Sequence, residues 1–534
     1  MLMKRKWLLP IMLGMLGACA APKAEEPTYI RPRTVITTDG EVDDYDSFLR
    51  LLLYANDLDI RAIVYSASQW HWEGDGKGTP LLPENRWTGP RVGISGPEFD
   101  APKESHRWIG RSWVPDLIDA YAQCYGNLVK HDPAYPSPEY LHSIVKVGNT
   151  RVEGDMSAPT EGSDYIKDLL LDDEPGPLFL QIWGGTNTVA RALLSIAEQY
   201  QGTADWEAVY RKVSDKAVLY IIQDQDGTYR NYVQPSWPEI RTFYNRMQFN
   251  GFAYLWRMVT PEPLQKVLRG DWFREQIVQD KGPLGAKYLG LGIPYPFDDP
   301  EDHYGDPEMV QRFPGADFND FISEGDSPSY FHLFDFLGLR SLEHPEWGGA
   351  GGRFIQESPR FWEDPMPEGG FSPFARRDRS EGEHPKVLFD RNAGDYNPYS
   401  GEVDLFYPQM RWVEVLQNDF AARIDWCVKE YADANHRPAV SVKGDLDIQA
   451  RPGETIELEA SAQDPDGDTV TLSWWQYREA GTADAELSLE GTESVRVTIP
   501  ADAVPGTTFH LIAQGMDSGT PALSHFQRVI ITIR

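Results

Sequence analysis

The sequence predicts an α/β protein with a mainly parallel, Rossmann-like sheet that carries helices on both faces, followed by an all-β sandwich. Two observations lead to this prediction. In the first half of the chain, β-branched and apolar runs alternate with helical periodicity, the pattern of strands joined by crossover helices. The chain after Pro438 instead shows short alternating strands separated by turn residues, as in an Ig-like sandwich.

The first half of the chain has alternating strand and helix patterns. The run TVITT, residues 34–38, is β-branched and apolar and predicts the first strand. Behind it, apolar residues from Phe48 to Leu53 recur at helical spacing. Further strands are expected at 58–68, 178–183 and 216–223, and a helix at 188–200.

The second half differs in composition. Residues 265–410 are rich in Gly, Pro, Trp, Tyr and Asp and lack clear periodicity, which is typical of functional loops. A last helical pattern spans 413–431 and precedes a boundary at 435–438. We therefore expect an α/β domain over 34–435 and a β-sandwich over 438–534. Strands of the sandwich are expected at 454–461, 469–477, 494–500, 509–515 and 528–534.

The N-terminus has the pattern of an export signal. A basic start is followed by an apolar stretch and by LGAC, residues 16–19, which resembles the bacterial lipobox. On this interpretation residues 1–18 are removed, Cys19 carries a lipid anchor, and residues 19–33 form a tether. The alternative is an ordinary cleaved signal with a chance cysteine. The lipobox predicts an exported, membrane-anchored bacterial lipoprotein, periplasmic or at the cell surface, with the outer membrane as one location.

Charge and cysteine content narrow the range of partners. The 534 residues include 82 acidic and 50 basic side chains, which gives a formal net charge of −32. Phosphate binding needs a basic face, so no nucleic-acid partner is expected. After the signal, no run reaches the roughly 18 apolar residues of a membrane-spanning helix. Cys124 and Cys427 either form a disulfide or remain two buried thiols, and the sequence leaves both open.

Four carboxylates crowd the loop TTDGEVDD behind the first strand: Asp39, Glu41, Asp43 and Asp44. They repel one another unless a cation or a set of backbone donors neutralises them. Carboxylate oxygens favour Ca²⁺ or Mg²⁺ over zinc, and α/β sheets place ligand sites at the carboxyl ends of their strands. The alternative is interaction with a helix dipole. That alternative explains Asp43 and Asp44 at a helix N-terminus but leaves Asp39 unexplained.

Residues 35–44, VITTDGEVDD, resemble the N-terminal signature of nucleoside hydrolases, in which a strand ends in Asp-x-Asp-x-x-x-Asp-Asp and binds Ca²⁺. Asp39, Asp43 and Asp44 match three carboxylates of that signature, whereas Thr37 stands at the first. The resemblance implies a nucleoside-hydrolase-like α/β fold and a calcium ion as cofactor.

Two further segments resemble the same family. WGGTNTVA, residues 183–190, is similar to its Gly-x-x-Thr-Asn-x-Ala segment, whose threonine, here Thr186, supplies an oxygen to the calcium ion. SEGDSP, residues 323–328, stands where the family brings its last calcium-binding aspartate, here Asp326. The chain as a whole resembles bacterial secreted proteins called cellulose-binding, which join a nucleoside-hydrolase-like domain to an Ig-like domain. The segments that carry this match are 323–334, 344–354 and 518–533.

The resemblance implies hydrolysis of a glycosyl bond, in which Ca²⁺ holds a water and two ring hydroxyls while a carboxylate takes the proton of the water. Asp39 is expected as this catalytic base and as a metal ligand, and direct attack by water predicts inversion at the anomeric carbon. The other expected metal ligands are Asp44, Thr186 and Asp326. Residues expected on the substrate side are Asp43, Asn187, Glu324, Trp70, His71 and Trp347. The group that protonates the leaving group is left open among His71, His332 and Glu324.

Export and the attached sandwich suit a glycan of extracellular origin better than a nucleoside. We therefore expect a Ca²⁺-dependent hydrolase of an N- or O-glycoside of furanosyl type. The alternative is a non-catalytic lipoprotein that binds cellulose or another plant glycan and retains the fold; a nucleoside scavenger is a third interpretation. The presence of Asp39 favours the enzyme, because a pure binder has no need of a base.

Overall fold

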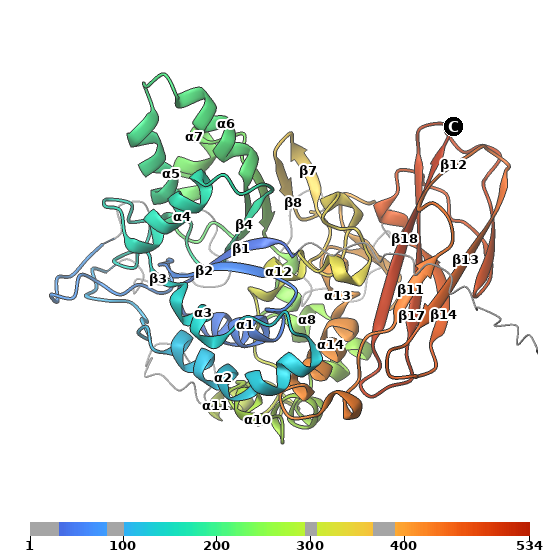
Figure 1. Cartoon of the computed structure of the whole chain (residues 1–534), viewed down its shortest axis with the longest axis horizontal. Coiled ribbons are helices and arrows are strands. Elements are labelled where there is room, and N and C mark those ends of the chain that lie inside the picture. The colour runs from blue at the N-terminus through green and yellow to red at the C-terminus, as the bar shows by residue number, and fades with distance from the viewer. Residues whose placement is uncertain (1–30, 83–100, 294–306, 367–389) are drawn as a thin grey trace, which may run out of the picture. The chain divides into compact units, whose positions relative to one another are not determined.

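A central sheet contains eight strands in the order β3-β2-β1-β4-β5-β6-β8-β7 (Figure 1). All neighbouring strands pair in parallel except β7 and β8, which are antiparallel at one edge. The mainly parallel sheet confirms the predicted fold class. The strands are β1 (Arg33–Thr38), β2 (Asp59–Tyr65), β3 (Val145–Val147), β4 (Leu178–Ile182), β5 (Ala217–Ile222), β6 (Arg241–Asn245), β7 (Ile355–Ser358) and β8 (Phe361–Glu363).

The computed structural model describes residues 31–82, 101–293, 307–366 and 390–534. The expected signal peptide, Cys19 and the tether as far as Ile30 lie outside the described residues. Within the described ranges, no helix is long and apolar enough to cross a membrane.

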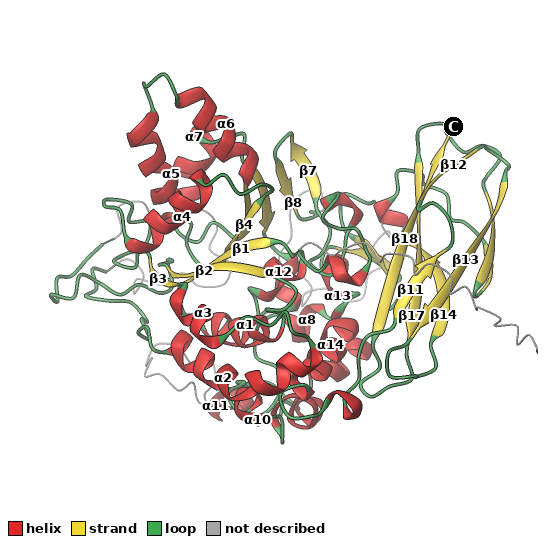
Figure 2. Ribbon diagram, in the orientation of Figure 1, coloured by secondary structure: helices red, strands yellow, loops and turns green. Residues whose placement is uncertain are grey.

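Helices cover both faces of the central sheet (Figure 2). Neighbouring residues of β1 face opposite cores, because side chains alternate along a strand. Ile36 belongs to the core that includes α1 and α2, and Val35 to the core that includes α4 and α5. The helices are α1 (Val42–Leu53), α2 (Trp113–His131), α3 (Pro138–Ser143), α4 (Glu161–Leu171), α5 (Asn187–Tyr200), α6 (Trp206–Lys216), α7 (Gln234–Ser236), α8 (Trp256–Val259), α9 (Gly270–Phe273), α10 (Gly282–Gly285), α11 (Pro307–Arg312), α12 (Ser327–Phe331), α13 (Tyr407–Met410) and α14 (Val413–Asp425).

The segment 265–410, expected to consist of loops, also contains short regular elements. It supplies α9 to α13, the edge strands β7 and β8, and the hairpin of β9 (Asp395–Asn397) and β10 (Glu402–Asp404). Strands of three or four residues are too short to show an alternating pattern, so the pairing of β8 with β6 and of β7 with β8 is a tertiary feature.

The C-terminal part confirms the predicted all-β region. Its strands form two four-stranded sheets, in the orders β11-β13-β16-β15 and β12-β18-β17-β14. Apolar side chains of both sheets share one core, for example Leu458 and Val497 from one sheet and Leu511 and Ile531 from the other. The strands are β11 (Ala439–Val442), β12 (Asp447–Ala450), β13 (Thr455–Gln463), β14 (Thr471–Gln476), β15 (Leu489–Gly491), β16 (Ser494–Thr498), β17 (Thr508–Met516) and β18 (Ser524–Ile533).

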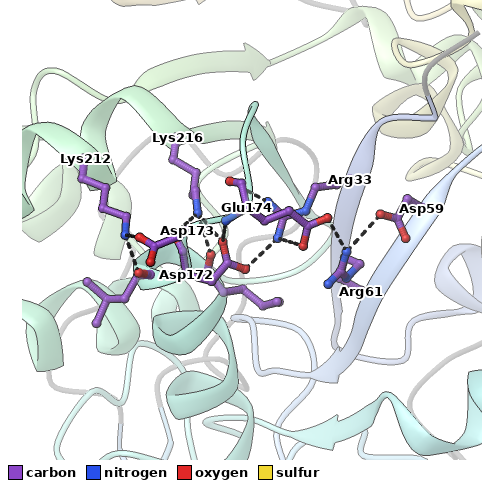
Figure 3. Close-up of polar contacts among 10 residues, drawn as sticks. Arg33, Asp59, Arg61, Asp172, Asp173, Glu174, Lys212 and Lys216 are labelled. Carbon is purple, nitrogen blue, oxygen red and sulfur yellow. Dashed lines mark hydrogen bonds and ion pairs between the residues drawn. The ribbon is translucent and has the colours of Figure 1, made fainter.

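An ion-pair network joins the amino end of the central sheet to the ends of α4 and α6 (Figure 3). Asp172 accepts a hydrogen bond from Arg33 Nη2 at 2.8 Å and pairs with the buried Lys216. Glu174 pairs with Arg61 at 3.0 Å. Because the strands are parallel, this network lies at the opposite edge of the sheet from the acidic loop.

The two cysteines of the described chain are both buried, and both are free thiols in this structure. Cys124 lies on α2 and Cys427 follows α14. Of the two possibilities left open by the sequence, the structure therefore shows the pair of thiols.

Candidate metal site at the carboxyl edge of the sheet

The acidic loop turns directly from β1 into α1. Gly40, with φ of +82°, takes a conformation that other residues rarely adopt. Glu41 is the N-cap of α1, and its backbone N–H donates to Asp44 Oδ2 at 3.1 Å. The Thr38 hydroxyl donates to the other oxygen of Asp44. These local hydrogen bonds orient the Asp44 carboxylate back toward the end of β1. They do not compensate the negative charge of Asp39.

Asp39 is a buried carboxylate without hydrogen-bond donors. Its side chain is 1% exposed, and within the described part of the chain neither of its oxygens has a hydrogen-bond partner. The hydroxyl of Thr186, also fully buried, has none there either. Buried polar groups are nearly always satisfied in folded proteins, and an isolated buried charge is costly. A bound cation would satisfy both groups.

Side chains that could hold such a cation gather at this edge. Among the described residues, one group with mutual ligand-atom distances within 4.8 Å comprises Asp39, Glu41 and His71. A second comprises Glu41, Asp43 and Asp44. Asp326 belongs to neither group. Burial, followed by the charges of Asp44, Asp43 and Asp39, nevertheless raises the pKa of Asp326 well above its usual value.

Burial and mutual repulsion raise the pKa values of carboxylates in the loop. Burial, and then the charge of Asp39, raises the pKa of Asp43 to about 6. Burial, and then the charges of Asp39 and Asp43, raises the pKa of Asp44. Asp43 is also within 3.3 Å of the hydroxyls of Ser323 and Tyr254. The site therefore concentrates negative charge in a dry environment, which favours binding of a cation.

Two glycines bring the distant segments against this loop. A Cβ atom at Gly184 would lie 2.6 Å from Asp39 Cγ, and one at Gly325 would lie 2.4 Å from Asp43 Oδ2. No side chain fits at either position without a shift. The structure thus brings the segments around 39–44, 184–186 and 323–326 together, as the sequence analysis expects.

Residues 33–354 match the family model described as the nucleoside hydrolase-like domain of cellulose-binding Sde182. The chain belongs to this family. Residues 455–533 match the C-terminal domain of cellulose-binding protein Sde0182. The comparison with curated proteins gives no match.

One solved structure shares the Sde182 family fold. A nucleoside hydrolase-related hypothetical protein from Saccharophagus degradans, associated with carbohydrate metabolism, aligns with a TM-score of 0.63 and 24% identity, over 94% of this chain and 100% of that one. The plant nucleoside hydrolase PpNRh1 aligns with a TM-score of 0.31 and 10% identity, over 74% of this chain and 100% of that one. The first alignment shows a shared fold.

In this Sde182 family member, Asn187 is held within the protein. Its Nδ2 donates to the Asn149 carbonyl at 2.8 Å, and its Oδ1 accepts from Ser66 at 2.8 Å. Its backbone N–H donates to Asp226 Oδ2 at 2.9 Å. The sequence analysis did not single out Ser66 and Asp226. These residues follow β2 and β5, and the sequence signal that could have found them is a polar residue after an apolar strand. These contacts position the 184–187 turn; a substrate contact of Asn187 stays a prediction.

Glu324 is fully buried and paired with Arg50 of α1. Its Oε2 lies 2.5 Å from Arg50 Nε, and Tyr288 donates to its Oε1 at 2.6 Å. Ser327 donates to Oε2 at 2.9 Å. These partners favour a positioning role for Glu324, which holds the segment that carries Asp326. Its expected substrate contact stays a prediction.

The aromatic and histidine positions differ in their surroundings. His71 is buried beside Asp39, and Trp70 is half-buried next to it. Trp347 is also half-buried, but it packs against His510 of β17, with ring centroids 5.2 Å apart. The substrate roles of Trp70, His71 and Trp347 stay predictions.

His332 is a poor candidate for the leaving-group acid. It packs against the rings of Tyr220, Phe243 and Phe354. Burial, and then the charge of Arg241, lowers its pKa to about 4. His332 is therefore neutral at physiological pH. Its surroundings suit a core residue better than a proton donor.

Proposed function

We propose that this chain is a divalent-cation-dependent hydrolase of a glycosidic bond, acting on a furanosyl-type N- or O-glycoside of extracellular origin. One observation carries the proposal: the buried carboxylate of Asp39, without hydrogen-bond donors among the described residues, lies at the carboxyl edge of the sheet within a group of further ligands. A structural carboxylate in this position would be expected to have a partner. A carboxylate that binds a cation and accepts a proton needs both oxygens available.

The oxygen donors at this edge fit Ca²⁺. Asp39, Asp44, Thr186 and Asp326 are the residues that would hold it, and the orphaned oxygens of Asp39 and Thr186 are the structural support for this set. When bound, the cation supplies positive charge that orients sugar hydroxyls and lowers the pKa of a water molecule.

The chain's own residues would contribute the remaining chemistry. Asp39 accepts the proton of the attacking water, because its carboxylate is not engaged by hydrogen bonds within the described residues. Asp43, which faces the hydroxyls of Tyr254 and Ser323, accepts a hydrogen bond from a ring hydroxyl. Attack in a single displacement inverts the anomeric configuration.

Turnover by the purified mature chain tests the proposal. The substrates are a panel of aryl furanosides, nucleosides and plant oligosaccharides, each with and without chelator, and the comparison is Asp39→Asn. We expect hydrolysis of at least one furanoside that chelator and Asp39→Asn both abolish, with an inverted product by NMR. Turnover that depends on neither the cation nor Asp39 would contradict the proposal. Release of free base from inosine or uridine alone would identify a nucleoside scavenger instead.

A second candidate is binding of cellulose or another plant glycan without catalysis. The description of the matched family as cellulose-binding favours it. If the chain is a binder, wild type and Asp39→Asn are expected to sediment with insoluble cellulose to the same extent. Neither protein should then hydrolyse anything in the panel. Turnover in the panel thus separates the two functions, because hydrolysis requires Asp39 and binding does not.

We also propose that the protein is an exported lipoprotein anchored at Cys19. The lipobox-like LGAC at residues 16–19 supports this. Expression of Cys19→Ala in a bacterial host, followed by separation of membrane and soluble fractions, is expected to release the chain from the membrane fraction.

A further inference from the structure

We propose that the C-terminal sandwich binds a divalent cation of its own, Ca²⁺, through side-chain oxygens of Asn435, Asp464 and Asp517. Amide and carboxylate oxygens are the ligands that Ca²⁺ prefers in proteins. None of these residues belongs to the acidic loop behind β1 or to the segments that meet it. The inference therefore goes beyond the proposed function and does not depend on it.

Three separate turns of the chain meet at this place. Asn435 precedes β11, Asp464 directly follows β13, and Asp517 directly follows β17. Asn435 Nδ2 lies 3.3 and 3.2 Å from the two carboxylate oxygens of Asp517. The Ser518 hydroxyl donates to Asp468 Oδ1 at 3.0 Å, which joins the turn after β17 to the turn after β13. These contacts bring the three candidate ligands to one end of the sandwich.

The amide oxygen of Asn435 is a buried acceptor without a donor. The residue is 7% exposed, and within the described ranges its Oδ1 has no hydrogen-bond partner. Its Nδ2 donates to the Pro521 carbonyl at 2.7 Å and faces the carboxylate of Asp517, so the amide is held inside the cluster. A Cβ atom at Gly519 would lie 2.4 Å from Oδ1, which shows how closely the turn packs on the amide. A bound cation would satisfy this oxygen.

Asp464 also has an oxygen that the local fold does not use. Its Oδ1 accepts the backbone N–H groups of Asp466 and Asp468 at 2.9 and 3.0 Å, which accounts for the tight turn after β13. Its Oδ2 is buried and has no hydrogen-bond partner in the described part of the chain. The neighbouring carboxylate of Asp466 is engaged differently, by the backbone N–H and Nδ1 of His436 at 2.6 and 2.9 Å. The turn therefore explains one oxygen of Asp464 and leaves the other available to a cation.

The charges of Asp464 and Asp517 add to the case for a cation. Burial raises the pKa of Asp517, and the charge of Asp464 raises it further. Asp517 Oδ1 accepts the backbone N–H groups of Gly519 and Leu523 at 3.0 and 2.9 Å, whereas Oδ2 faces the Asn435 amide. The two carboxylates together carry the charge that one divalent cation neutralises. Backbone carbonyls and waters would complete the shell of about six to eight oxygens that Ca²⁺ takes.

Calorimetric titration of the chelator-treated mature chain with Ca²⁺ tests the inference. All proteins carry Asp39→Asn, so that a cation at the acidic loop does not obscure the result. The variants are Asp464→Asn and Asp517→Asn, and the matched control is Asp502→Asn in an exposed turn of the sandwich. Each of the two variants should weaken Ca²⁺ binding by at least about 10-fold, because each removes one ligand charge. Asp502→Asn should leave the affinity unchanged.

Asn435→Asp provides a test of the opposite sign. The variant places a third carboxylate beside Asp464 and Asp517, which should tighten Ca²⁺ binding by at least about threefold and lower Tm in chelator. Added Ca²⁺ should restore that Tm. An asparagine that serves only as a hydrogen-bond donor to Asp517 would instead give a variant that Ca²⁺ does not stabilise.

The outcomes separate this inference from the proposed hydrolysis. Equal Ca²⁺ affinity of the parent and a folded Asp464→Asn, or an Asn435→Asp variant that Ca²⁺ does not stabilise, would overturn the inference. Ca²⁺ binding that depends on Asp464 and Asp517, with no turnover in the substrate panel, would support the inference and remove the hydrolysis.

Discussion

At the scale of the residue, Asp39 connects stability with function. Its charge is buried and lacks hydrogen-bond donors in the described chain, which destabilises the metal-free fold. The same carboxylate raises the pKa of Asp43 and Asp44. A group that opposes folding in this way is expected at a functional site, where a ligand offsets the cost when it binds.

Replacement of Asp39 by Asn is expected to stabilise the metal-free protein. Removal of the buried charge should raise the free energy of unfolding by about 1–3 kcal/mol in the presence of chelator. The variant should also lose the stabilisation that added cation gives to wild type. Urea unfolding monitored by fluorescence, with and without the cation, measures both effects. A less stable variant in chelator would show that Asp39 has a compensating partner.

His332 makes stability depend on pH. Its folded pKa of about 4 lies below the ordinary value of 6.5, so between these values the unfolded chain binds more protons. Stability is therefore expected to rise with pH from about 4 to 6.5, by up to about 3 kcal/mol from this residue. His332→Gln should flatten the dependence of Tm on pH in this window. An unchanged slope would show that His332 is accessible to protons in the folded state.

At the scale of the element, α1 links the acidic loop to the segment that carries Asp326. Arg50 of α1 and Glu324 are both fully buried and form an ion pair at 2.5 Å. Arg50 also lies 4.0 Å from the centroid of the Phe420 ring on α14. One buried pair thus fixes the helix that begins at the site against the segment on the other side of it.

Breaking this pair is expected to be costly. Arg50→Met leaves the Glu324 charge buried with Tyr288 and Ser327 as its hydrogen-bond partners among the described residues, and should lower the free energy of unfolding by about 3–5 kcal/mol. The double variant Arg50→Met with Glu324→Gln should recover part of that loss, because no uncompensated charge remains. Chemical denaturation of the three proteins checks this. Additive losses would show that the two residues do not act as a pair.

The elements that could be predicted from the sequence are those with long periodic patterns. β1, β2, β4 and β5 and helix α5 lie within one to three residues of the expected positions, because apolar alternation and helical spacing extend over whole elements. β3, β7 and β8 have three or four residues and carry no such pattern. Their place in the sheet depends on neighbours that are distant in the chain.

At the scale of the whole molecule, the ion-pair network that is expected to stabilise the fold and the candidate site lie at opposite ends of the strands of the central sheet. The network around Asp172 and Lys216 lies at the amino ends of the strands (Figure 3). The acidic loop follows the carboxyl end of β1. Ligand sites of parallel sheets lie at the carboxyl edge. Substitutions at the amino edge should therefore affect folding without affecting metal binding.

Asp172→Asn tests this separation. Lys216 is only 7% exposed, and loss of its charged partner should lower the free energy of unfolding by about 1.5–3 kcal/mol. Asp173→Asn is the matched control, because Asp173 is fully exposed and its pair with Lys212 should contribute little to stability. Cation affinity should equal that of wild type in both variants. A changed affinity in Asp172→Asn would show coupling between the two edges.

The sequence alone determined the α/β class, the all-β C-terminal region, and the three segments that carry candidate ligands, because each depends on local composition and spacing. Only the tertiary structure decided that Asp39 is buried without hydrogen-bond donors in the described residues, that His71 lies beside it, and that Glu324 pairs with Arg50. Such relations join residues 32 to 274 positions apart. Their distances are set by packing across the sheet, which local periodicity does not encode.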